Sequence, residues 1–265
     1  MEQKAGKVRK GISGSTLKLI AIITMLGDHI GAAILERIMI AKGFAGSTSV
    51  EEMRVFIENN STLYYMDMGL RLIGRISFPI FCFLLIEGFC HTHDVKKYLM
   101  RLFGFALLSE VPFDLAFSGK IFALHYQNVF FTLFIGILVL TAFEWVHKKE
   151  MNQILQILCQ LAAVAVGITL TYLLRVDYAI YGVLIIVLMY LLRKNKIMEM
   201  LAGCIGLNAM SLSEITAFFA LIPISLYNGK RGWNLKYIFY LFYPVHLIIL
   251  YLIAYALGIS YIQVV

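Results

Sequence analysis

One stretch of the chain decides its fold class: Leu17-Lys-Leu-Ile-Ala-Ile-Ile-Thr-Met-Leu-Gly-Asp-His-Ile-Gly-Ala-Ala-Ile-Leu35. It is almost entirely apolar and long enough to cross a bilayer, which takes about 20 helical residues. Asp28 and His29 interrupt it side by side. Ionisable side chains at membrane depth are costly and usually face a bundle interior or a water-filled cavity. The pair is therefore a candidate functional site; the alternative is a buried polar pair that only fixes helix packing.

The composition of the whole chain agrees with a membrane protein. Apolar residues make up 60% and charged residues 15% of the 265 positions, against about 45–50% and about 25% in soluble domains. We expect an all-α, polytopic helical bundle in one domain, residues 1–265, of which residues 1–14 are a basic cytoplasmic leader. The four cysteines lack disulfide or metal-ligand spacing, and we predict no metal site.

Apolar runs and their punctuation predict about nine membrane-spanning helices. The later segments are short, and two of them, 197–210 and 215–227, could instead form one re-entrant pair. The nine segments are Thr16–Leu35, Leu72–Phe89, Tyr98–Phe117, Asn128–Val146, Ile154–Leu174, Tyr178–Leu192, Ile197–Met210, Ile215–Tyr227 and Tyr237–Leu257.

Charge predicts the orientation of these segments. If the basic leader is cytoplasmic and each segment crosses once, most Lys and Arg residues fall on the cytoplasmic side, in the leader and in the loops at Lys96, Lys148, Lys194 and Lys230. This bias follows the positive-inside rule. The net charge of +7 therefore indicates topology rather than nucleic-acid binding. We expect a multi-pass plasma-membrane protein with a cytoplasmic N-terminus.

That topology places further polar residues at the outer side of the membrane. Arg71 and Arg75 are four apart at the outer end of the second segment, and Glu110 and Asp114 are four apart in the third. Residues four apart share a helix face. We expect the two arginines and two carboxylates to form the ion-paired lining of an outward cavity, beside Asn128. The alternative is a salt-bridge network that only holds three helices together.

Two later stretches carry polar residues as well. Asn208, Ser211, Ser213 and Glu214 form a predicted outer turn, which we expect to be solvated. In the last segment, Tyr240-Leu-Phe-Tyr-Pro-Val-His246 places a proline and a histidine inside a predicted span. A proline frees backbone polar groups, which is tolerated only beside protein or water. His246 and the Tyr243 hydroxyl are therefore further candidates for a functional site.

Several of these motifs, in order along the chain, resemble the TraX family of membrane proteins. The resemblance covers nearly the whole sequence and rests on the stretches at 17–31, 71–89, 91–102, 109–117, 127–132 and 243–247. The namesake of that family is tied to N-terminal acetylation of conjugative pilin. The family is similar to the type-three acyltransferases and to the heparan-α-glucosaminide N-acetyltransferases, which take acyl-CoA on the cytoplasmic side and modify an acceptor on the other face.

The resemblance implies a membrane-embedded acyltransferase, with acetyl as the expected acyl group. Transfer from a thioester needs a base for the attacking amine or hydroxyl, and histidine serves near neutral pH. We expect His29 to be that base, with His246 as the other candidate. Asp28, Glu110 or Asp114 would orient it. The expected substrate-binding residues are Arg71, Arg75, Asn128, Tyr243 and His246. The absence of a nucleophilic Ser or Cys motif favours direct transfer.

The implied co-substrate is acetyl-CoA, with no metal. Its phosphates are expected at the cytoplasmic helix ends, where the candidates are Lys96, Lys97, Arg101, Arg231 and Lys236. The other expected partners are the lipid bilayer and an acceptor, either a peptide N-terminus or a glycan. The alternative function is a small proton-coupled transporter that uses Asp28, His29, Arg71 and Glu110 as a relay. We find no inverted repeat, which would favour that alternative.

Overall fold

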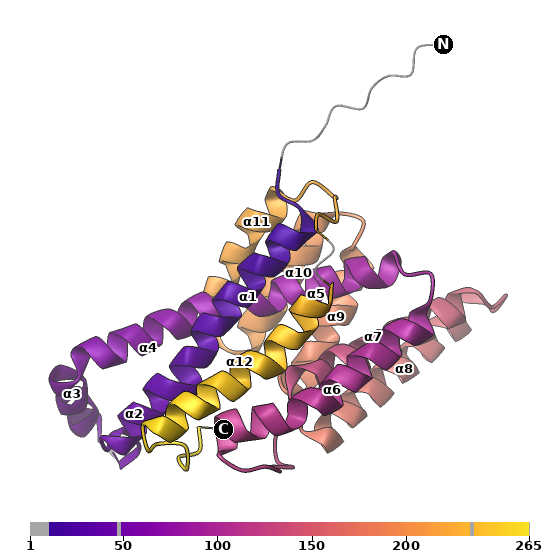
Figure 1. Ribbon diagram of the computed structural model, residues 1–265. Helices are drawn as coiled ribbons and strands as arrows, with labels where there is room; N and C mark the ends of the chain where they lie inside the picture. Colours follow the sequence, from indigo (N-terminus) through magenta and orange to yellow (C-terminus); the bar gives the residue numbers. More distant parts are fainter. Residues whose placement is uncertain (1–10, 47–48, 234–235, 265) are drawn as a thin grey trace.

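The chain forms a bundle of helices (Figure 1), which confirms the all-α prediction. The computed structural model describes residues 11–46, 49–233 and 236–264, without the side chains of 236–238. Its helices are α1 (Gly14–Ile30), the π-helical turn η1 (Gly31–Leu35), α2 (Glu36–Ala41), the 3-10 turn η2 (Phe44–Gly46), α3 (Val50–Asn59), α4 (Ser61–Gly74), α5 (Ser77–Cys90), α6 (Val95–Ser118), α7 (Val129–His147), α8 (Gln153–Leu174), α9 (Ala179–Leu192), α10 (Lys196–Met210), the 3-10 helix η3 (Leu212–Ala220), α11 (Leu221–Ser225) and α12 (Lys236–Ala256).

Polar residues fix the start of several of these helices. Such a residue caps a helix by accepting hydrogen bonds from backbone N–H groups of the first turn, which have no partner within the helix. Asp94 Oδ1 accepts from the Lys97 N–H at 2.9 Å, and Asn152 Oδ1 accepts from the Leu155 N–H at 2.8 Å. Ser13, Asn128 and Asn195 cap α1, α7 and α10 in the same way.

Five helical stretches in the described part of the chain are long and apolar enough to cross a bilayer: Gly14–Ala41, Ser61–Cys90, Val129–His147, Gln153–Leu174 and Phe239–Ala256. Two shorter apolar stretches, Ala179–Leu192 and Leu212–Ser225, follow the same pattern. The helix α6 has 24 residues but carries charges at both ends and near its middle. The expected number of nine crossings therefore stays a prediction.

The first two predicted segments are longer than the sequence indicated. The first continues from Gly14 through the π-helical turn to Ala41, and the second begins at Ser61 rather than Leu72. Arg71 and Arg75 therefore lie inside a 30-residue helical stretch and not at its outer end, as we had expected. Charged residues lowered the local hydropathy of these stretches, but the helix continues past them: Arg71 is paired with Asp28, and Arg37 is fully buried.

Backbone hydrogen bonds show which segments meet at each end of the bundle. At one end, the N–H groups of Gly14 and Ser15 donate to the carbonyls of Lys230 and Arg231 in the α11–α12 loop, at 2.8 and 3.0 Å. At the other end, the Val264 N–H donates to the Phe117 carbonyl at 3.0 Å. The two described ends of the chain thus lie at opposite ends of the bundle (Figure 1).

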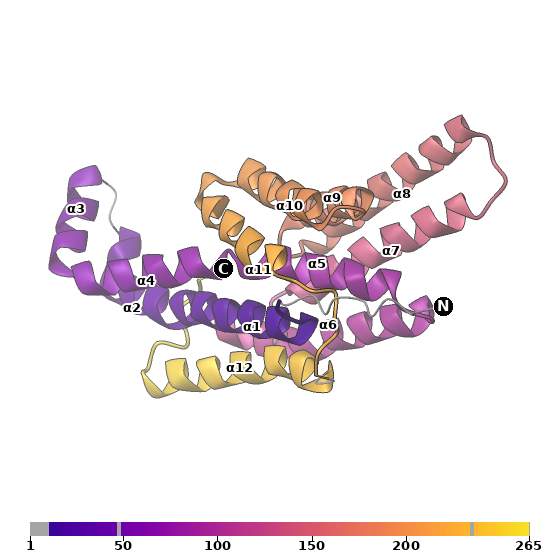
Figure 2. The ribbon, with the colours of Figure 1, turned by 90° about the horizontal axis from the view of Figure 1, so that it is seen from above.

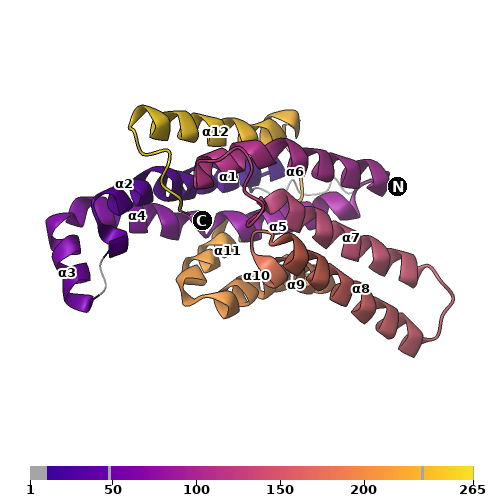
Figure 3. The ribbon, with the colours of Figure 1, turned by 90° about the horizontal axis from the view of Figure 1, so that it is seen from below.

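The helix α1 lies in the middle of the bundle. It has α12 on one side and α4 and α5 on the other, whereas α7 to α10 lie beyond α5 (Figures 2 and 3). Glycines allow α1 and α4 to pack closely, as small residues do between membrane helices. A Cβ atom on Gly74 would lie 2.3 Å from the Asp28 Cβ atom. This close packing brings α4 against the Asp28-His29 turn.

Candidate functional site

A cavity of about 460 Å³ lies beside that turn. Its walls come mainly from α1, α4, α5 and α6, from the α6–α7 and α8–α9 loops and from the start of α9, with single residues from η1, α2, α7, α10, α12 and the C-terminal tail. The polar and charged residues that line it are Asp28, His29, Glu36, Arg71, Arg75, Ser77, Tyr126, Asp177, Tyr178, Tyr181 and Tyr243. The structure therefore brings five of the predicted site residues, Asp28, His29, Arg71, Arg75 and Tyr243, to one cavity.

His29 and His246 form a direct hydrogen bond in the wall of this cavity. His29 Nδ1 lies 2.7 Å from His246 Nε2, and the two rings are close to parallel. His246 Nδ1 in turn lies 2.7 Å from the Phe242 carbonyl oxygen. The ring of His29 also meets the edges of Phe117 and Tyr243, with centroids 5.4 and 5.9 Å apart. The two histidines that the sequence offered as rival bases are thus neighbours.

The hydrogen bonds determine where the protons of the neutral pair reside. A carbonyl oxygen can only accept, so His246 Nδ1 carries a proton and donates it to Phe242. His246 Nε2 is then the acceptor, and His29 Nδ1 donates to it. The remaining nitrogen, His29 Nε2, keeps its lone pair. His29 lines the cavity, whereas His246 does not.

Asp28 is paired with an arginine and does not orient His29. Its Oδ2 atom lies 3.0 Å from Arg71 Nη1, and its other oxygen is buried with no hydrogen bond to any described residue. The His29 nitrogen that a carboxylate would orient is bonded to His246 instead. Adjacent residues point about 100° apart around a helix, which explains why Asp28 turns toward α4 and His29 toward α12.

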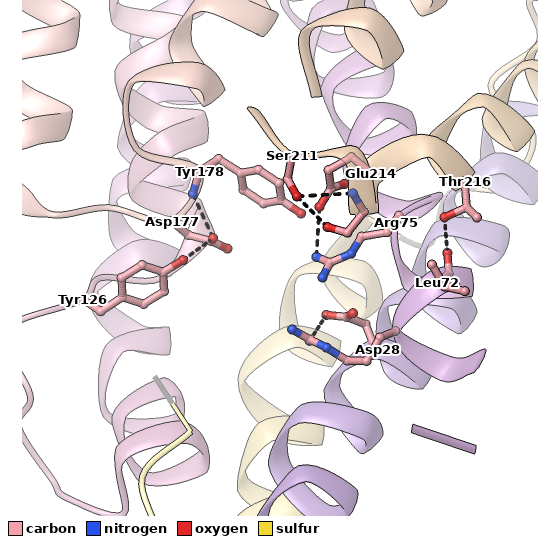
Figure 4. Close-up of polar contacts among 11 residues, drawn as sticks. Asp28, Leu72, Arg75, Tyr126, Asp177, Tyr178, Ser211, Glu214 and Thr216 are labelled. Carbon is pink, nitrogen blue, oxygen red and sulfur yellow. Dashed lines mark hydrogen bonds and ion pairs between the residues drawn. The ribbon is translucent and has the colours of Figure 1, made fainter. Parts of the chain in front are cut away.

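The second arginine forms an ion pair that the sequence did not indicate. Arg75 Nη1 lies 3.1 Å from Glu214 Oε1, and the Glu214 side chain is 2% exposed (Figure 4). We had expected Glu214 to lie in a solvated turn, and this was wrong. The Thr216 hydroxyl donates to the Leu72 carbonyl at 2.6 Å (Figure 4). These contacts hold the start of η3 against the α4–α5 junction and bury the carboxylate there.

Glu110 and Asp114 do not pair with the arginines, so this part of the expected ion-paired lining was wrong. Arg71 and Arg75 pair with Asp28 and Glu214 instead. The Glu110 carboxylate accepts from the Asn128 side chain, and Asp114 Oδ2 accepts from the Ala123 N–H at 2.7 Å. Asn128 is fully buried and also donates to the Ala106 carbonyl. These three residues hold the α6–α7 loop against α6, and none of them lines the cavity.

Asp177, in the loop between α8 and α9, is the most tightly hydrogen-bonded of the cavity residues that the sequence did not indicate. Its Oδ1 atom accepts from the Tyr126 hydroxyl at 2.6 Å and from the Tyr178 N–H at 2.8 Å (Figure 4). The Thr132 hydroxyl donates to its carbonyl. Burial raises the pKa of Asp177 to about 6, although the hydrogen bonds from Tyr126 and Tyr178 oppose that shift. A lone aspartate in a short connection gave no signal in the sequence.

The residues expected to bind the co-substrate lie away from the cavity. Lys96 and Lys97 are exposed in the first turn of α6, and Lys97 Nζ lies 3.1 Å from Asp94. Arg101 lies over the Tyr98 ring at 5.7 Å, and Arg231 is in the α11–α12 loop. None of these four lines the cavity. The side chain of the fifth, Lys236, is outside the described residues.

The fold and the site define an all-helical protein with several candidate membrane spans around a polar cavity. Comparison with known families then gives its relationship: the family described as "TraX protein" matches residues 13–254, and the chain belongs to the TraX family. It is 29% identical over 269 positions to a protein of Dichelobacter nodosus named "Probable fimbrial assembly protein FimC, serogroup H1", covering 90% of this chain and 94% of that protein. No solved structure matches the chain.

Proposed function

We propose that this protein is a membrane-embedded acyltransferase in which His29 Nε2 is the general base. One observation carries the proposal. The hydrogen bonds from His29 to His246 and from His246 to the Phe242 carbonyl leave a single ring nitrogen with a free lone pair, and the ring that holds it faces the cavity. A base needs this arrangement: a fixed tautomer, and access to the proton that it removes.

The reaction assigns each part of the site a role. The acceptor's N–H or O–H donates to His29 Nε2 and transfers its proton there as the acceptor atom attacks the thioester carbonyl. The charged His29 ring keeps its hydrogen bond to His246, which orients it. The bond from carbonyl carbon to sulfur then breaks, and the leaving thiolate takes up the proton. Arg71 and Arg75 would stabilise the negative charge that develops on the carbonyl oxygen.

We place the acyl-CoA phosphates at the basic end of the bundle, on the cytoplasmic side of the plasma membrane. Lys96, Lys97, Arg101, Arg231 and Lys236 remain the proposed contacts. A series of aromatic rings in mutual contact connects that end of the bundle to the base. Tyr240 lies near Arg101 and stacks on Phe105 with centroids 4.7 Å apart. Phe130 and Tyr243 continue the series to His29.

The acceptor would enter the cavity from the opposite end. There the α6–α7 loop, the α8–α9 loop and the C-terminal tail contribute Tyr126, Asp177 and Val264 to the walls. The D. nodosus relative is named as a fimbrial assembly protein, which favours the N-terminus of an exported peptide over a glycan as the acceptor. The buried polar pairs around the cavity are also compatible with the transporter that we considered from the sequence.

The test is acyl transfer by the purified protein in lipid nanodiscs, with labelled acetyl-CoA and a panel of peptide and amino-sugar acceptors. We expect the His29→Ala variant to lose a factor of about 10²–10⁴ in turnover, with unchanged acetyl-CoA binding by calorimetry. The matched control is His147→Ala, because His147 is exposed at the end of α7. Near-normal turnover by His29→Ala would remove the base assignment. If the wild-type protein binds no acetyl-CoA, the class is wrong, and proton-coupled uptake into proteoliposomes would identify a transporter.

A further inference from the structure

The charges around the cavity do not balance. Arg71 is paired with Asp28, and Arg75 is paired with Glu214. Two more carboxylates, Glu36 and Asp177, line the same cavity, and neither has an ion-pair partner among the described residues. Among the described residues, the lining contains no lysine and no third arginine. The cavity therefore has more negative than positive groups, and it favours ligand groups that donate hydrogen bonds or carry positive charge.

Asp177 differs from Glu36 because it is rigidly held. Both of its hydrogen bonds, from Tyr126 and from the Tyr178 N–H, go to Oδ1. No described residue donates to Oδ2. The Asp177 backbone is fixed as well, because its N–H donates to the Gln127 carbonyl at 2.9 Å and Thr132 donates to its carbonyl. One carboxylate oxygen is thus bound by the protein and the other has no protein partner.

The backbone beside Asp177 adopts an unfavourable conformation. Tyr178 and Ala179 have φ angles of 59° and 43°, in the left-handed region that residues other than glycine avoid. The Tyr178 ring stacks on Phe78 with centroids 3.6 Å apart, which holds this turn in place. Strain of this kind persists where the surroundings enforce it, and it concentrates at functional sites.

Asp177 and the base both line this cavity but come from different elements, Asp177 from the α8–α9 loop and His29 from α1. Figure 4 shows Tyr126 and Asp177 on one side and Asp28 and Arg75 on the other. Between Tyr126 and His29 the wall is aromatic: the ring of Phe113 contacts those of Tyr126 and Phe117 at 5.9 and 4.9 Å, and Phe117 contacts His29. A ligand that reaches both polar groups must therefore carry two separate polar groups of its own.

We propose that Asp177 determines which acceptors the cavity admits: Oδ2 accepts a hydrogen bond from a second, non-reacting donor or cationic group of the acceptor, and the carboxylate excludes an anion at that place. This inference rests on the proposed function, because it assumes that the reacting group of the acceptor is the one beside His29. The preferred ligand is then bifunctional, with a nucleophile at one end and a hydrogen-bond donor at the other.

The experiment uses three probes of similar length: 1,4-diaminobutane, butylamine and 4-aminobutanoate. Each is added to the purified full-length protein without acetyl-CoA, and the apparent affinity is read from the shift in melting temperature. We expect the wild-type protein to prefer the diamine over butylamine by about 10- to 100-fold, since charge-assisted hydrogen bonds are stronger than neutral ones. The aminobutanoate should bind most weakly. If the diamine stabilises the protein no better than butylamine does, the proposal is wrong.

The variants separate Asp177 from the general charge of the cavity. Asp177→Asn keeps an oxygen that can accept from Tyr126 and removes the charge. The ratio of the affinities for the diamine and for butylamine should therefore fall to near one. Tyr126→Phe removes the hydrogen bond to Oδ1 and should weaken the same preference. This variant replaces Asp177→Asn as the test if Asp177→Asn does not fold. Glu36→Gln is the matched control and should keep the preference. If Glu36→Gln abolishes it equally, or Asp177→Asn retains it, the assignment is overturned.

The same measurements separate this inference from the proposed function. The melting experiment contains no acyl donor, so its outcome does not depend on transfer. If the wild-type protein shows the diamine preference but acylates no acceptor, the proposed function fails and Asp177 remains a ligand-binding residue. If transfer occurs and Asp177→Asn has unchanged KM values for all three amines, the proposed function stands and the role of Asp177 is refuted.

Discussion

At the scale of single residues, the contact between His29 and His246 is the most informative feature. The sequence identified both, because a histidine in an apolar run is uncommon. It could not show that the two touch, since 217 positions separate them. Asp28, Arg71, Arg75 and Tyr243 were found by the same reasoning and do line the cavity. The partner of Arg75, Glu214, was missed because residues in a short connection usually remain solvated.

The contact between the two histidines predicts losses of kcat that differ between two variants of His246. Replacing His246 with Phe removes the hydrogen bond that fixes the His29 tautomer and holds the charged ring after proton transfer. A hydrogen bond to a charged group contributes about 1.5–3 kcal/mol, so kcat should fall by about 10- to 100-fold. His246→Gln should recover part of the loss, because its amide oxygen can accept from His29. Both variants should keep the wild-type KM for acetyl-CoA in steady-state assays. If His246→Phe is inactive while His29→Ala turns over normally, the roles of the two histidines are reversed.

At the scale of helices, the apolar runs located the elements but not their limits. Each of the nine predicted segments corresponds to a helical stretch of the described chain. The first two extend further than predicted, because Glu36, Arg37, Asp67 and Arg71 lowered the hydropathy without ending the helix. Arg37 shows why: it is fully buried and donates to the Ile262 carbonyl at 2.7 Å. A hydropathy pattern cannot recognise a charge that the tertiary structure satisfies.

The α1–α4 contact gives a prediction at the same scale. A methyl group at Gly74 would meet Asp28 at 2.3 Å and force the two helices apart, so Gly74→Ala should destabilise the protein by about 1–3 kcal/mol. It should also weaken the Arg71–Asp28 pair and lower activity. Gly69→Ala on the same helix is the control, because its Cβ would meet nothing within 4 Å. Melting temperatures in nanodiscs measure the difference, and equal stability of the two variants would contradict the close packing.

At the scale of the whole molecule, the contacts divide the connections into two groups. Tyr126 and Asp177 bring the α6–α7 and α8–α9 loops to one cavity, and Glu214 at the start of η3 pairs with Arg75 in its lining. At the other end, Lys196 Nζ donates to the Tyr227 carbonyl at 2.6 Å, which joins the start of α10 to the end of α11. The N-terminal segment pairs with the α11–α12 loop there. The charges predict the same grouping of these loops, and their orientation in the membrane stays a prediction.

The predicted orientation follows from combining this grouping with the positive-inside rule. Cysteines placed at Lys120, Arg175 and Leu212 should react with an impermeant maleimide in intact cells, whereas those at Lys148, Lys194 and Lys230 should react only after permeabilisation. The exposed or half-buried native cysteines, Cys90 and Cys159, are first replaced by serine.

The labelling pattern also decides the number of crossings. If α10 and the η3–α11 stretch form a re-entrant pair instead of two spans, Leu212→Cys alone will change from labelled to protected, because both ends of that pair stay on the cytoplasmic side. Reaction of Lys120→Cys and Lys148→Cys from the same side would be a more serious contradiction. Those positions lie at the two ends of α7, one of the five stretches long and apolar enough to span. That result would mean that α7 does not cross the bilayer, and the cavity would then have no defined outer face.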